Sequence, residues 1–325
     1  MVNMGYYTEI PRIFHYYPLI IRQRYAEKQK IYYFCREDNF LHKMVSIDEL
    51  KKISSQVRRD IIRMVTGAKS GHPGGSMSST DFLTALYFGG VMKHDPATWT
   101  RSGRGQDVFV LSAGHLSPVY YSLLARAGYF PVKELGTFRK FGTRLQGHPS
   151  VESGLPGVFQ ASGSLGQGLS VAAGFALEKK LDNDGNTVYV AMGDGECEEG
   201  QIWEAAMFCA HHRIDNLIAM VDWNGQQIDG RIDDVAGVGD LAAKWEAFGW
   251  TVTECDGHDF DSILQAYGRA KAGLGKGKPV LILMKSDMGH GVDFMAGTHK
   301  WHGKAPNAEQ CEEALSQLEE TLGDY

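Results

Sequence analysis

The hydrophobic positions of the chain follow no regular period up to residue 43 and a clear helical one immediately afterwards. Between residues 44 and 66, an apolar residue recurs at every fourth position among charged ones: Ile53, Val57, Ile61 and Val65. This spacing predicts an amphipathic helix, and Ser46 with Glu49 has the spacing of a capping box at its start. Residues 1–43 instead hold three pairs of adjacent tyrosines and show neither a helical nor a strand period. We therefore expect an N-terminal appendage over residues 1–43 and the domain proper over residues 44–325.

Beyond residue 107, short apolar runs alternate with helical stretches. The apolar runs, rich in β-branched residues, are 108–111, 187–192, 217–221, 251–253 and 279–284. The helical patterns between them are 118–127, 165–181, 202–212 and 261–272. Such an alternation is typical of parallel strands covered by helices on both faces. The sequence thus predicts an α/β fold with a doubly wound parallel sheet, in which ligands bind beyond the carboxyl ends of the strands.

Composition narrows the possible functions. The chain has 33 basic and 39 acidic residues, a formal charge of −6, and no block of Lys or Arg, so we expect no nucleic-acid or anionic-membrane partner. Its five cysteines are odd in number and form no C-x-x-C pair, which argues against a disulfide framework or a zinc cluster. No apolar stretch reaches the roughly 18 residues of a membrane span, and the start does not resemble a signal peptide. We expect a soluble, cytoplasmic protein.

Two loops that follow apolar runs carry the most informative chemistry. Gly193-Asp194-Gly195 follows the run 187–192, and Asn224-Gly225-Gln226 comes shortly after the run 217–221. The thirty positions between Asp194 and Asn224 suit one βαβ crossover, which would place the two loops side by side. A few oxygen ligands suit Mg²⁺ shared with phosphate oxygens, and glycines at a helix start favour an anion. Each loop alone could be a simple turn, but the two together favour a metal and diphosphate site.

Glycine-rich and histidine-containing loops provide weaker signals. Residues 162–168 are rich in glycine and open the helical stretch 165–181, but their glycine order is not that of a dinucleotide-binding loop. Seven histidines stand in loops of small residues, where imidazoles suit hydroxyl and phosphate recognition: His72, His115, His148, His258, His290, His299 and His302. We expect His211, His212 and His258 to be structural.

In their order along the chain, these motifs resemble the N-terminal half of the transketolases. The resemblance covers about residues 48–305 and rests on a set of seven motifs: Ser70-Gly-His-Pro-Gly-Gly, Leu111-Ser-Ala-Gly-His115, Gly147-His-Pro, Gly163-Ser-Leu-Gly-Gln-Gly168, Gly193-Asp-Gly with Glu199-Gly, Val221-Asp-Trp-Asn-Gly and Gly297-Thr-His. A single one of these motifs would carry little information, whereas the ordered set is specific.

The resemblance implies thiamine diphosphate as cofactor, and it implies a role for particular residues. Asp194, Asn224 and the carbonyl of Gln226 would bind Mg²⁺, with Ca²⁺ or Mn²⁺ as substitutes. The residues that would lie against the cofactor are His115, Gly163, Leu165, Gly193, Asp194, Gly195, Asn224 and His299. The catalytic group would comprise His72 and His148 at the sugar substrate, His299 against the cofactor, and Glu199 in a carboxylate network across the subunit interface. His302 is a weaker candidate for the same pocket.

Departures from the family pattern are few. Ser164 replaces a common proline, and the segment from His148 to Gly163 is slightly longer than usual. We also expect Glu196, Cys197 and Glu198 to add negative charge beside the metal loop. None of these positions is an implied metal ligand.

The resemblance further implies a partner. Transketolases continue with a pyrimidine-binding domain, which supplies a glutamate to the cofactor, and with a third domain, whereas this chain stops at Tyr325. The family also occurs as two separate subunits, and the chain resembles the first of them. We expect two-carbon ketol transfer between sugar phosphates by an assembly with two copies of each chain. The alternatives are one half of a deoxyxylulose-phosphate synthase, or a cofactor-binding subunit without catalysis.

Overall fold

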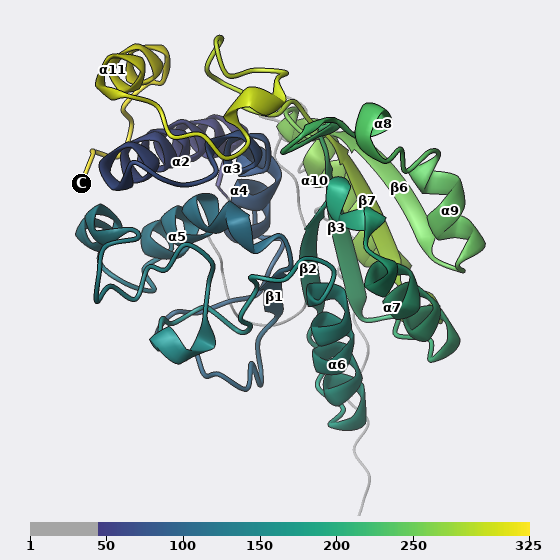
Figure 1. Cartoon of the computed structure of the whole chain (residues 1–325). Coiled ribbons are helices and arrows are strands. Elements are labelled where there is room, and N and C mark those ends of the chain that lie inside the picture. Colours follow the sequence, from purple (N-terminus) through teal and green to yellow (C-terminus); the bar gives the residue numbers. More distant parts are fainter. Residues whose placement is uncertain (1–44) are drawn as a thin grey trace, which may run out of the picture.

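The fold is known from a computed structural model that describes residues 45–325 (Figure 1). A five-stranded sheet with the order β1-β2-β3-β7-β6 forms its centre, and every pair of neighbouring strands is parallel. The strands are β1 (Val108–Leu111), β2 (Val188–Gly193), β3 (Leu217–Trp223), β6 (Thr251–Asp256) and β7 (Val280–Lys285). All five correspond to the predicted apolar runs, so the expected doubly wound α/β fold is confirmed.

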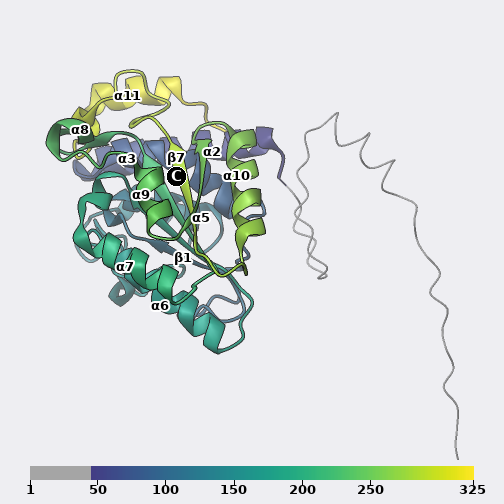
Figure 2. The same ribbon diagram turned by 90° about the vertical axis from the view of Figure 1, so that its right-hand side faces the viewer.

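Helices cover both faces of the sheet. One face packs against α2 (Ile47–Ala68), α4 (Thr80–Phe88), α5 (Ser117–Arg126) and α10 (Phe260–Gly273). The other packs against α6 (Gly168–Leu181), α7 (Gly200–His211) and α9 (Leu241–Ala247), and Figure 2 views the molecule from the side of α7 and α9. Side chains alternate between the two faces along each strand: Phe109 joins the first core and Val108 the second.

The connections explain why one helix changes face. The chain runs from β1 to β2 to β3 and then to the far strand β6, with α6, α7 and α9 as crossover helices on one face. It then turns back to insert β7 between β3 and β6, and this connection carries α10. Since parallel crossovers are right-handed, reversing the direction across the sheet moves α10 to the opposite face.

Helix α2 begins where the capping box predicts. The Glu49 N–H donates to Ser46 Oγ at 3.2 Å, and the Ser46 N–H donates back to the Glu49 carboxylate at 2.8 Å. Residues 1–43, for which an appendage is predicted, and Met44 lie outside the described residues. The predicted helix from Leu165 begins only at Gly168, because Gly166 adopts a left-handed φ of 80° that no α-helix contains.

Several short elements were not predicted. They comprise the helices α3 (Pro73–Ser78), α4, α8 (Ile232–Val235), α9 and α11 (Ala308–Gln317), the hairpin strands β4 (Gln226–Gln227) and β5 (Gly230–Arg231), and the 3-10 turns η1 (Gly114–Leu116), η2 (Val132–Thr137), η3 (Val151–Ser153), η4 (Gly195–Glu198) and η5 (His299–Trp301). None of the helices in residues 45–325 combines the length and the apolar character needed to cross a membrane.

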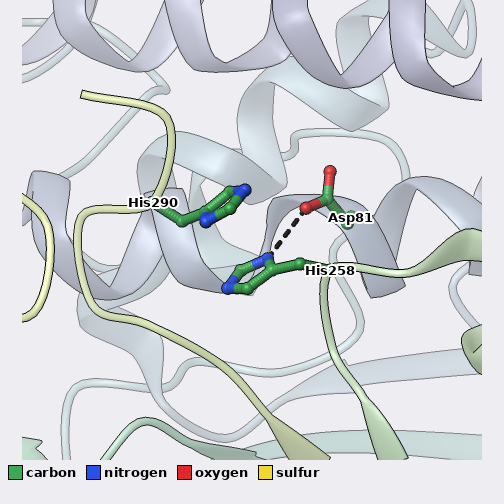
Figure 3. Close-up of side chains that lie close together, drawn as sticks. All are labelled: Asp81, His258 and His290. Atoms are coloured by element: carbon green, nitrogen blue, oxygen red, sulfur yellow. Dashed lines mark hydrogen bonds and ion pairs between the residues drawn. The ribbon is translucent and has the colours of Figure 1, made fainter. Parts of the chain in front are cut away.

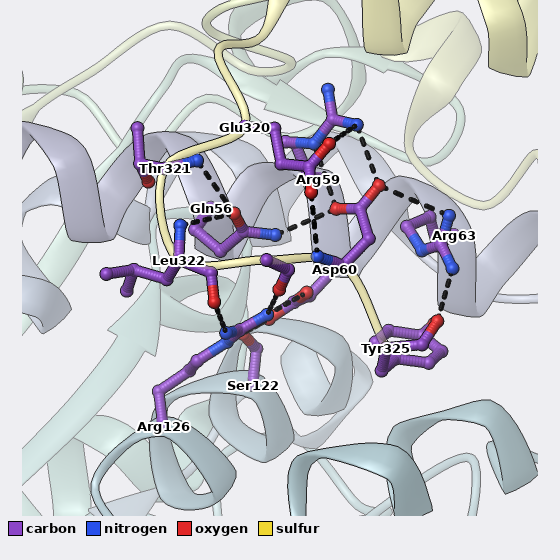
Figure 4. A network of polar contacts seen from close by, with 12 residues as sticks. Gln56, Arg59, Asp60, Arg63, Ser122, Arg126, Glu320, Thr321, Leu322 and Tyr325 are labelled. Carbon is purple, nitrogen blue, oxygen red and sulfur yellow. Dashed lines mark hydrogen bonds and ion pairs between the residues drawn. The ribbon is translucent and has the colours of Figure 1, made fainter.

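The C-terminal tail is tied to α2 and α5 by charged side chains (Figure 4). The Asp324 carboxylate accepts hydrogen bonds from Gln56 and Arg59 on α2, the latter through two bonds of 3.0 and 2.7 Å. Arg126 on α5 donates to the Gly323 carbonyl at 2.9 Å and pairs with the buried Asp60 of α2 at 2.8 Å. The tail thereby contacts both α2 and α5, which pack against each other on the same face of the sheet.

Candidate active site

The two strand-end loops lie side by side, as their spacing predicts. Gly193 at the end of β2 is in register with Asp222 on β3, and the Asp194 N–H donates to the Asp222 carbonyl at 3.2 Å. The Asp194 carboxylate accepts the N–H of Gly195 at 2.8 Å and that of Gly225, in the neighbouring loop, at 2.6 Å. One buried carboxylate therefore joins both loops.

The implied metal ligands Asp194, Asn224 and Gln226 lie in these two adjoining loops. Asn224 Oδ1 accepts the Gln226 N–H at 3.0 Å, a bond within the second loop. Behind them lies Asp222, whose buried carboxylate accepts from Asn224 Nδ2 at 3.0 Å and from Ser78 Oγ at 2.6 Å. No local pattern singles out Asp222, because its partner Ser78 lies 144 residues away.

The charges of the Asp194 and Asp222 carboxylates would suit a bound cation. Burial, and secondly the neighbouring Asp222 charge, raise the pKa of Asp194 to about 8. Burial likewise raises the pKa of Asp222, although hydrogen bonds from serine hydroxyls and Asn224 oppose the rise. Two carboxylates held together away from water favour a positive ion, which would restore their ionised forms. A carboxylate, an amide oxygen and a carbonyl are the hard oxygen donors that Mg²⁺ takes.

A glycine-rich loop flanks the metal loop and is fastened to it by Glu196. This buried carboxylate accepts the N–H of Gly166 at 2.8 Å and that of Gly193 at 3.1 Å, together with the hydroxyl of Ser112. Glu196 is therefore an internal link between loops, and burial raises its pKa. Of the residues expected to add negative charge beside the metal loop, Glu196 and Cys197 are buried and Glu198 is exposed.

The glycines of these loops border open space. A Cβ added to Gly163 or Gly193 would meet no atom within 4 Å, and one added to Gly195 would meet only the Gln227 side chain at 3.4 Å. Neither Gly193 nor Gly195 has a positive φ, so open space and not a special backbone conformation distinguishes these positions. Gly168 instead serves close packing, since its Cβ would lie 2.3 Å from that of Ser112.

Four of the histidines singled out in the sequence form a cluster close to the glycine-rich loop. The ring centroid of His72 lies 5.2 Å from that of His115, 6.4 Å from that of His148 and 5.6 Å from that of His302. The rings of His115 and His302 stack at 5.1 Å. His302, the weaker candidate, is thus central to the cluster, whereas His299 makes no ring contact with these four within the described part of the chain.

Helix α3 connects the histidine cluster with the buried carboxylate of Asp222. His72 precedes its first residue, and Ser78 at its end donates to Asp222. Six helical residues span about 9 Å, so the backbone of α3 separates His72 from Ser78 by about that length. Gly114, the residue before His115, packs directly against the glycine-rich loop. A Cβ added to Gly114 would lie 1.6 Å from the Ser162 carbonyl oxygen.

The clustered imidazoles are held neutral. Burial, reinforced by the charges of His302, Arg139 and His148, lowers the pKa of His72 to about 4. Burial also lowers the pKa of His115, His148 and His302. Nδ1 of His72 and Nδ1 of His302 are buried and have no hydrogen-bond partner within residues 45–325. Neutral imidazoles with unused nitrogens can donate to or accept from the hydroxyl groups of a ligand. An open depression in the surface is lined in part by His148 and Ser150, but by none of the other three histidines.

A second group of metal-ligating residues does not have the geometry of a cation site. Asp81, His258 and His290 lie close together, with the two imidazoles stacked at 3.5 Å (Figure 3). However, His258 bonds through Nδ1 to Asp81 at 2.9 Å and accepts the Asp287 N–H on Nε2 at 2.9 Å. Arg58 occupies both oxygens of Asp81. His258 is the satisfied structural residue that we expected.

The fold and the site define a class: a doubly wound α/β protein with buried carboxylates and glycine-rich loops at the carboxyl ends of adjacent parallel strands. Residues 50–322 match the family described as transketolase, thiamine diphosphate binding domain, and the chain belongs to this family.

Its relatives include separate subunits and longer enzymes. The chain is 41% identical to the 6-deoxy-6-sulfo-D-fructose transketolase subunit of Clostridium sp. (strain MSTE9), over 83% of this chain and 98% of the relative. It is 37% identical to one of the subunits of the apulose-4-phosphate transketolase of Phocaeicola vulgatus, over 86% of this chain and 96% of the relative. It also matches human transketolase at 33% identity, over 84% of this chain but only 42% of the relative.

Solved structures agree with this assignment. The transketolase of Campylobacter jejuni superposes with a TM-score of 0.77 at 32% identity, over 84% of this chain and 43% of that one. The transketolase of Leishmania mexicana superposes with the same TM-score of 0.77 at 29% identity, over 86% of this chain and 43% of that one. The chain thus has the fold and length of one part of these enzymes.

Proposed function

We propose that this chain is the cofactor-binding subunit of a two-subunit transketolase, which transfers a two-carbon ketol unit from a ketose phosphate to an aldose phosphate. The observation that carries the proposal is the convergence of the Asp194 and Asn224 loops beside a cluster of neutral histidines. The names of the relatives, which include subunits of about this length, support it.

The residues present suit Mg²⁺ and thiamine diphosphate. Asp194, Asn224 and the Gln226 carbonyl would hold the metal, and Gly163, Leu165, Gly193, Gly195 and His115 would hold the cofactor. Bound thiamine diphosphate would supply a carbanion-stabilising centre. The chain would contribute orientation, because Glu196 and the Gly225 N–H fix both loops before any ligand arrives.

The histidines would recognise the sugar. Because burial lowers their pKa values, His72 and His148 are neutral at pH 7 and can each donate one hydrogen bond and accept another. This pattern matches successive hydroxyl groups better than it matches a phosphate. His299 lies in η5, three residues before His302, and we assign it with them to the substrate side.

A partner chain would complete the site. Glu199 is exposed at the start of α7, and the exposed apolar residues Val171 on α6 and Met207 and Phe208 on α7 lie on the same pair of packed helices. Exposed apolar side chains on neighbouring helices suit a protein interface. We assign this surface to an assembly with two copies of each chain, in which a second subunit supplies the pyrimidine-binding domain. The free cysteines among the described residues fit a cytoplasmic reaction.

The test is to measure ketol transfer to ribose 5-phosphate by this chain alone and with the product of the neighbouring gene. Donors would be xylulose 5-phosphate and the compounds that name the relatives, 6-deoxy-6-sulfofructose and apulose 4-phosphate. We expect turnover only when both chains are present. Turnover by the isolated chain would refute the two-subunit proposal. Activity with pyruvate as donor would favour a deoxyxylulose-phosphate synthase, and cofactor binding without any turnover would favour a non-catalytic subunit.

A further inference from the structure

Arg139 has an unusual backbone conformation beside the histidine cluster. It follows η2 and adopts a left-handed φ of 55°, although it is not a glycine. Its N–H closes the loop by donating to the Leu145 carbonyl at 2.9 Å. A left-handed conformation costs an L residue about 1 kcal/mol or more and persists where the surroundings fix it.

The Arg139 side chain joins two histidine-bearing loops. Nη1 donates to Ser70 Oγ at 2.7 Å, and Ser70 stands two residues before His72. The guanidinium also lies flat against Gly147, immediately before His148: a Cβ added there would lie 2.9 Å from the Arg139 Cζ, and Nη2 lies 3.5 Å from the Gly147 carbonyl oxygen. Only glycine leaves space for this contact.

The His148 loop is also fastened to the helix that follows His115. Ser117 Oγ on α5 donates to the Gly147 carbonyl at 2.7 Å, and Tyr121 OH, one turn further along, donates to the Gln146 carbonyl at 2.9 Å. The backbone before His148 is therefore held on one side by α5 and on the other by Arg139. The loop before His72 receives its side-chain bond from Arg139.

We propose that Arg139 is a positioning residue of the substrate pocket, which sets the separation of His72 and His148 by bridging Ser70 and Gly147. The inference rests on the proposed function, since it assigns these histidines to the sugar. Arg139 would act through the two imidazoles and would not itself contact the reacting atoms.

Charge and hydrogen bonding distinguish this role from simple anchoring. The Arg139 charge lowers the pKa of both His72 and His148, in addition to the larger effect of burial. At the same time, Nε of Arg139 is buried with no hydrogen-bond partner within residues 45–325, and burial lowers the pKa of the guanidinium. The contacts of Arg139 with Ser70 and Gly147 act on the loops that carry the two histidines, so its effect should appear at those histidines.

The kinetic test uses both subunits together. Arg139→Gln removes the charge and one branch of the guanidinium fork, and we expect kcat/KM for the ketose phosphate to fall by about tenfold or more through a higher KM. Thiamine diphosphate affinity should stay within twofold, because the metal loops do not touch Arg139. Arg139→Lys should give an intermediate loss, since one ammonium cannot reproduce a planar fork. Lys140→Gln, an exposed neighbour with the same charge change, is the control.

A second measurement on the full chain alone needs no turnover. Histidine titrations by NMR, assigned with His72→Gln and His148→Gln, should show both pKa values rising in Arg139→Gln and not in Lys140→Gln. Ser70→Ala combined with Arg139→Gln should be less than additive in kcat/KM. Unchanged titrations and an unchanged kcat/KM in Arg139→Gln would overturn the proposal. If both subunits are inactive together while the titrations shift, the bridge to the histidines stands and the proposed function fails.

Discussion

The N–H of Gly225 donates a 2.6 Å hydrogen bond to the Asp194 carboxylate, and this bond crosses from the loop after β3 to the loop after β2. It places the two loops at a fixed distance without any ligand. The same carboxylate is also the charged group of the proposed metal point, so one side chain would serve both to shape the site and to bind in it.

We predict that Asp194→Asn weakens Mg²⁺-dependent thiamine diphosphate binding by about 100-fold, because the only charged ligand is lost from a buried site. The free energy of unfolding of the unliganded chain should change by no more than about 1 kcal/mol, since an amide oxygen still accepts one N–H and the repulsion by Asp222 disappears. Calorimetric titration and denaturant unfolding measure the two effects. The exposed Asp233→Asn is the control, and an unchanged affinity in Asp194→Asn would contradict the assignment.

Glu196 offers a contrast with its neighbour Glu198. Glu196→Ala leaves the N–H groups of Gly166 and Gly193 without their buried acceptor, so we expect a loss of about 3 kcal/mol in the free energy of unfolding and weaker cofactor binding. Glu198→Ala, at an exposed position, should cost less than about 0.5 kcal/mol. Equal effects of the two substitutions in urea unfolding would show that Glu196 does not hold the loops.

The buried imidazoles predict a dependence of stability on pH. His72 has an ordinary pKa of 6.5 in the unfolded chain and about 4 in the folded one, so below pH 6.5 the unfolded chain binds the proton more readily. Stability is therefore fully present above about pH 6.5 and declines as the pH falls towards 4. We expect His72→Gln to flatten this decline by about 1 to 2 kcal/mol between pH 7 and pH 4.5 in urea unfolding. A decline of the same size in His72→Gln would show that other groups cause it.

Local patterns predicted the elements whose signals are local. The start of α2 follows from two residues three positions apart, and β1, β2, β3 and β7 follow from apolar runs that are buried on both faces, whereas the edge strand β6 is largely exposed. Helix α3 was missed because Gly74 and Gly75 resemble a loop. These two glycines are needed because other parts of the chain pack closely against the helix. A Cβ added to Gly74 would lie 2.8 Å from the Met288 side chain, and one added to Gly75 would lie 2.6 Å from the Leu116 side chain.

In the candidate site, too, features with a local signal were predicted and features that depend on distant residues were not. The adjacency of the loops that carry Asp194 and Asn224 follows from one crossover, and sequence reasoning predicted it. Asp222 and Glu196 were missed as functional supports because their roles depend on Ser78 and Ser112, which lie 144 and 84 residues away. The insertion of β7 between β3 and β6 was equally hidden, since no local feature of an apolar run tells which strand it will join.

Residues 1–43 remain predicted to be an appendage. The family match begins at residue 50, and the cap of α2 is complete within residues 46–49. A chain that begins at Met44 should therefore bind thiamine diphosphate and the second subunit with unchanged affinity. Loss of turnover after this truncation, with the melting temperature unchanged, would reveal a role for the segment in the reaction.

Asp324 is the residue on which the attachment of the C-terminal tail most depends. It accepts from Gln56, Arg59 and Arg63, and the hydrogen bond from Arg59 is the first cause that lowers its pKa to about 2. The folded state thus favours the ionised carboxylate. Its contribution to stability is present above about pH 4, the ordinary value for an aspartate, and is lost as the pH falls through 4 towards 2.

We therefore predict that Asp324→Asn lowers the free energy of unfolding at pH 7 by about 1 to 2 kcal/mol, because the guanidinium of Arg59 is 10% exposed and keeps its bonds to backbone carbonyls but loses its close carboxylate partner. Glu320→Gln is the matched control: its carboxylate lies 3.7 Å from Arg59 and is 53% exposed, so water screens the pair. Urea unfolding at pH 7 and pH 3 separates the two, since only the Asp324 effect should shrink at the lower pH. An equal loss in both variants at pH 7 would mean that net charge, and not the buried bonds of Asp324, holds the tail.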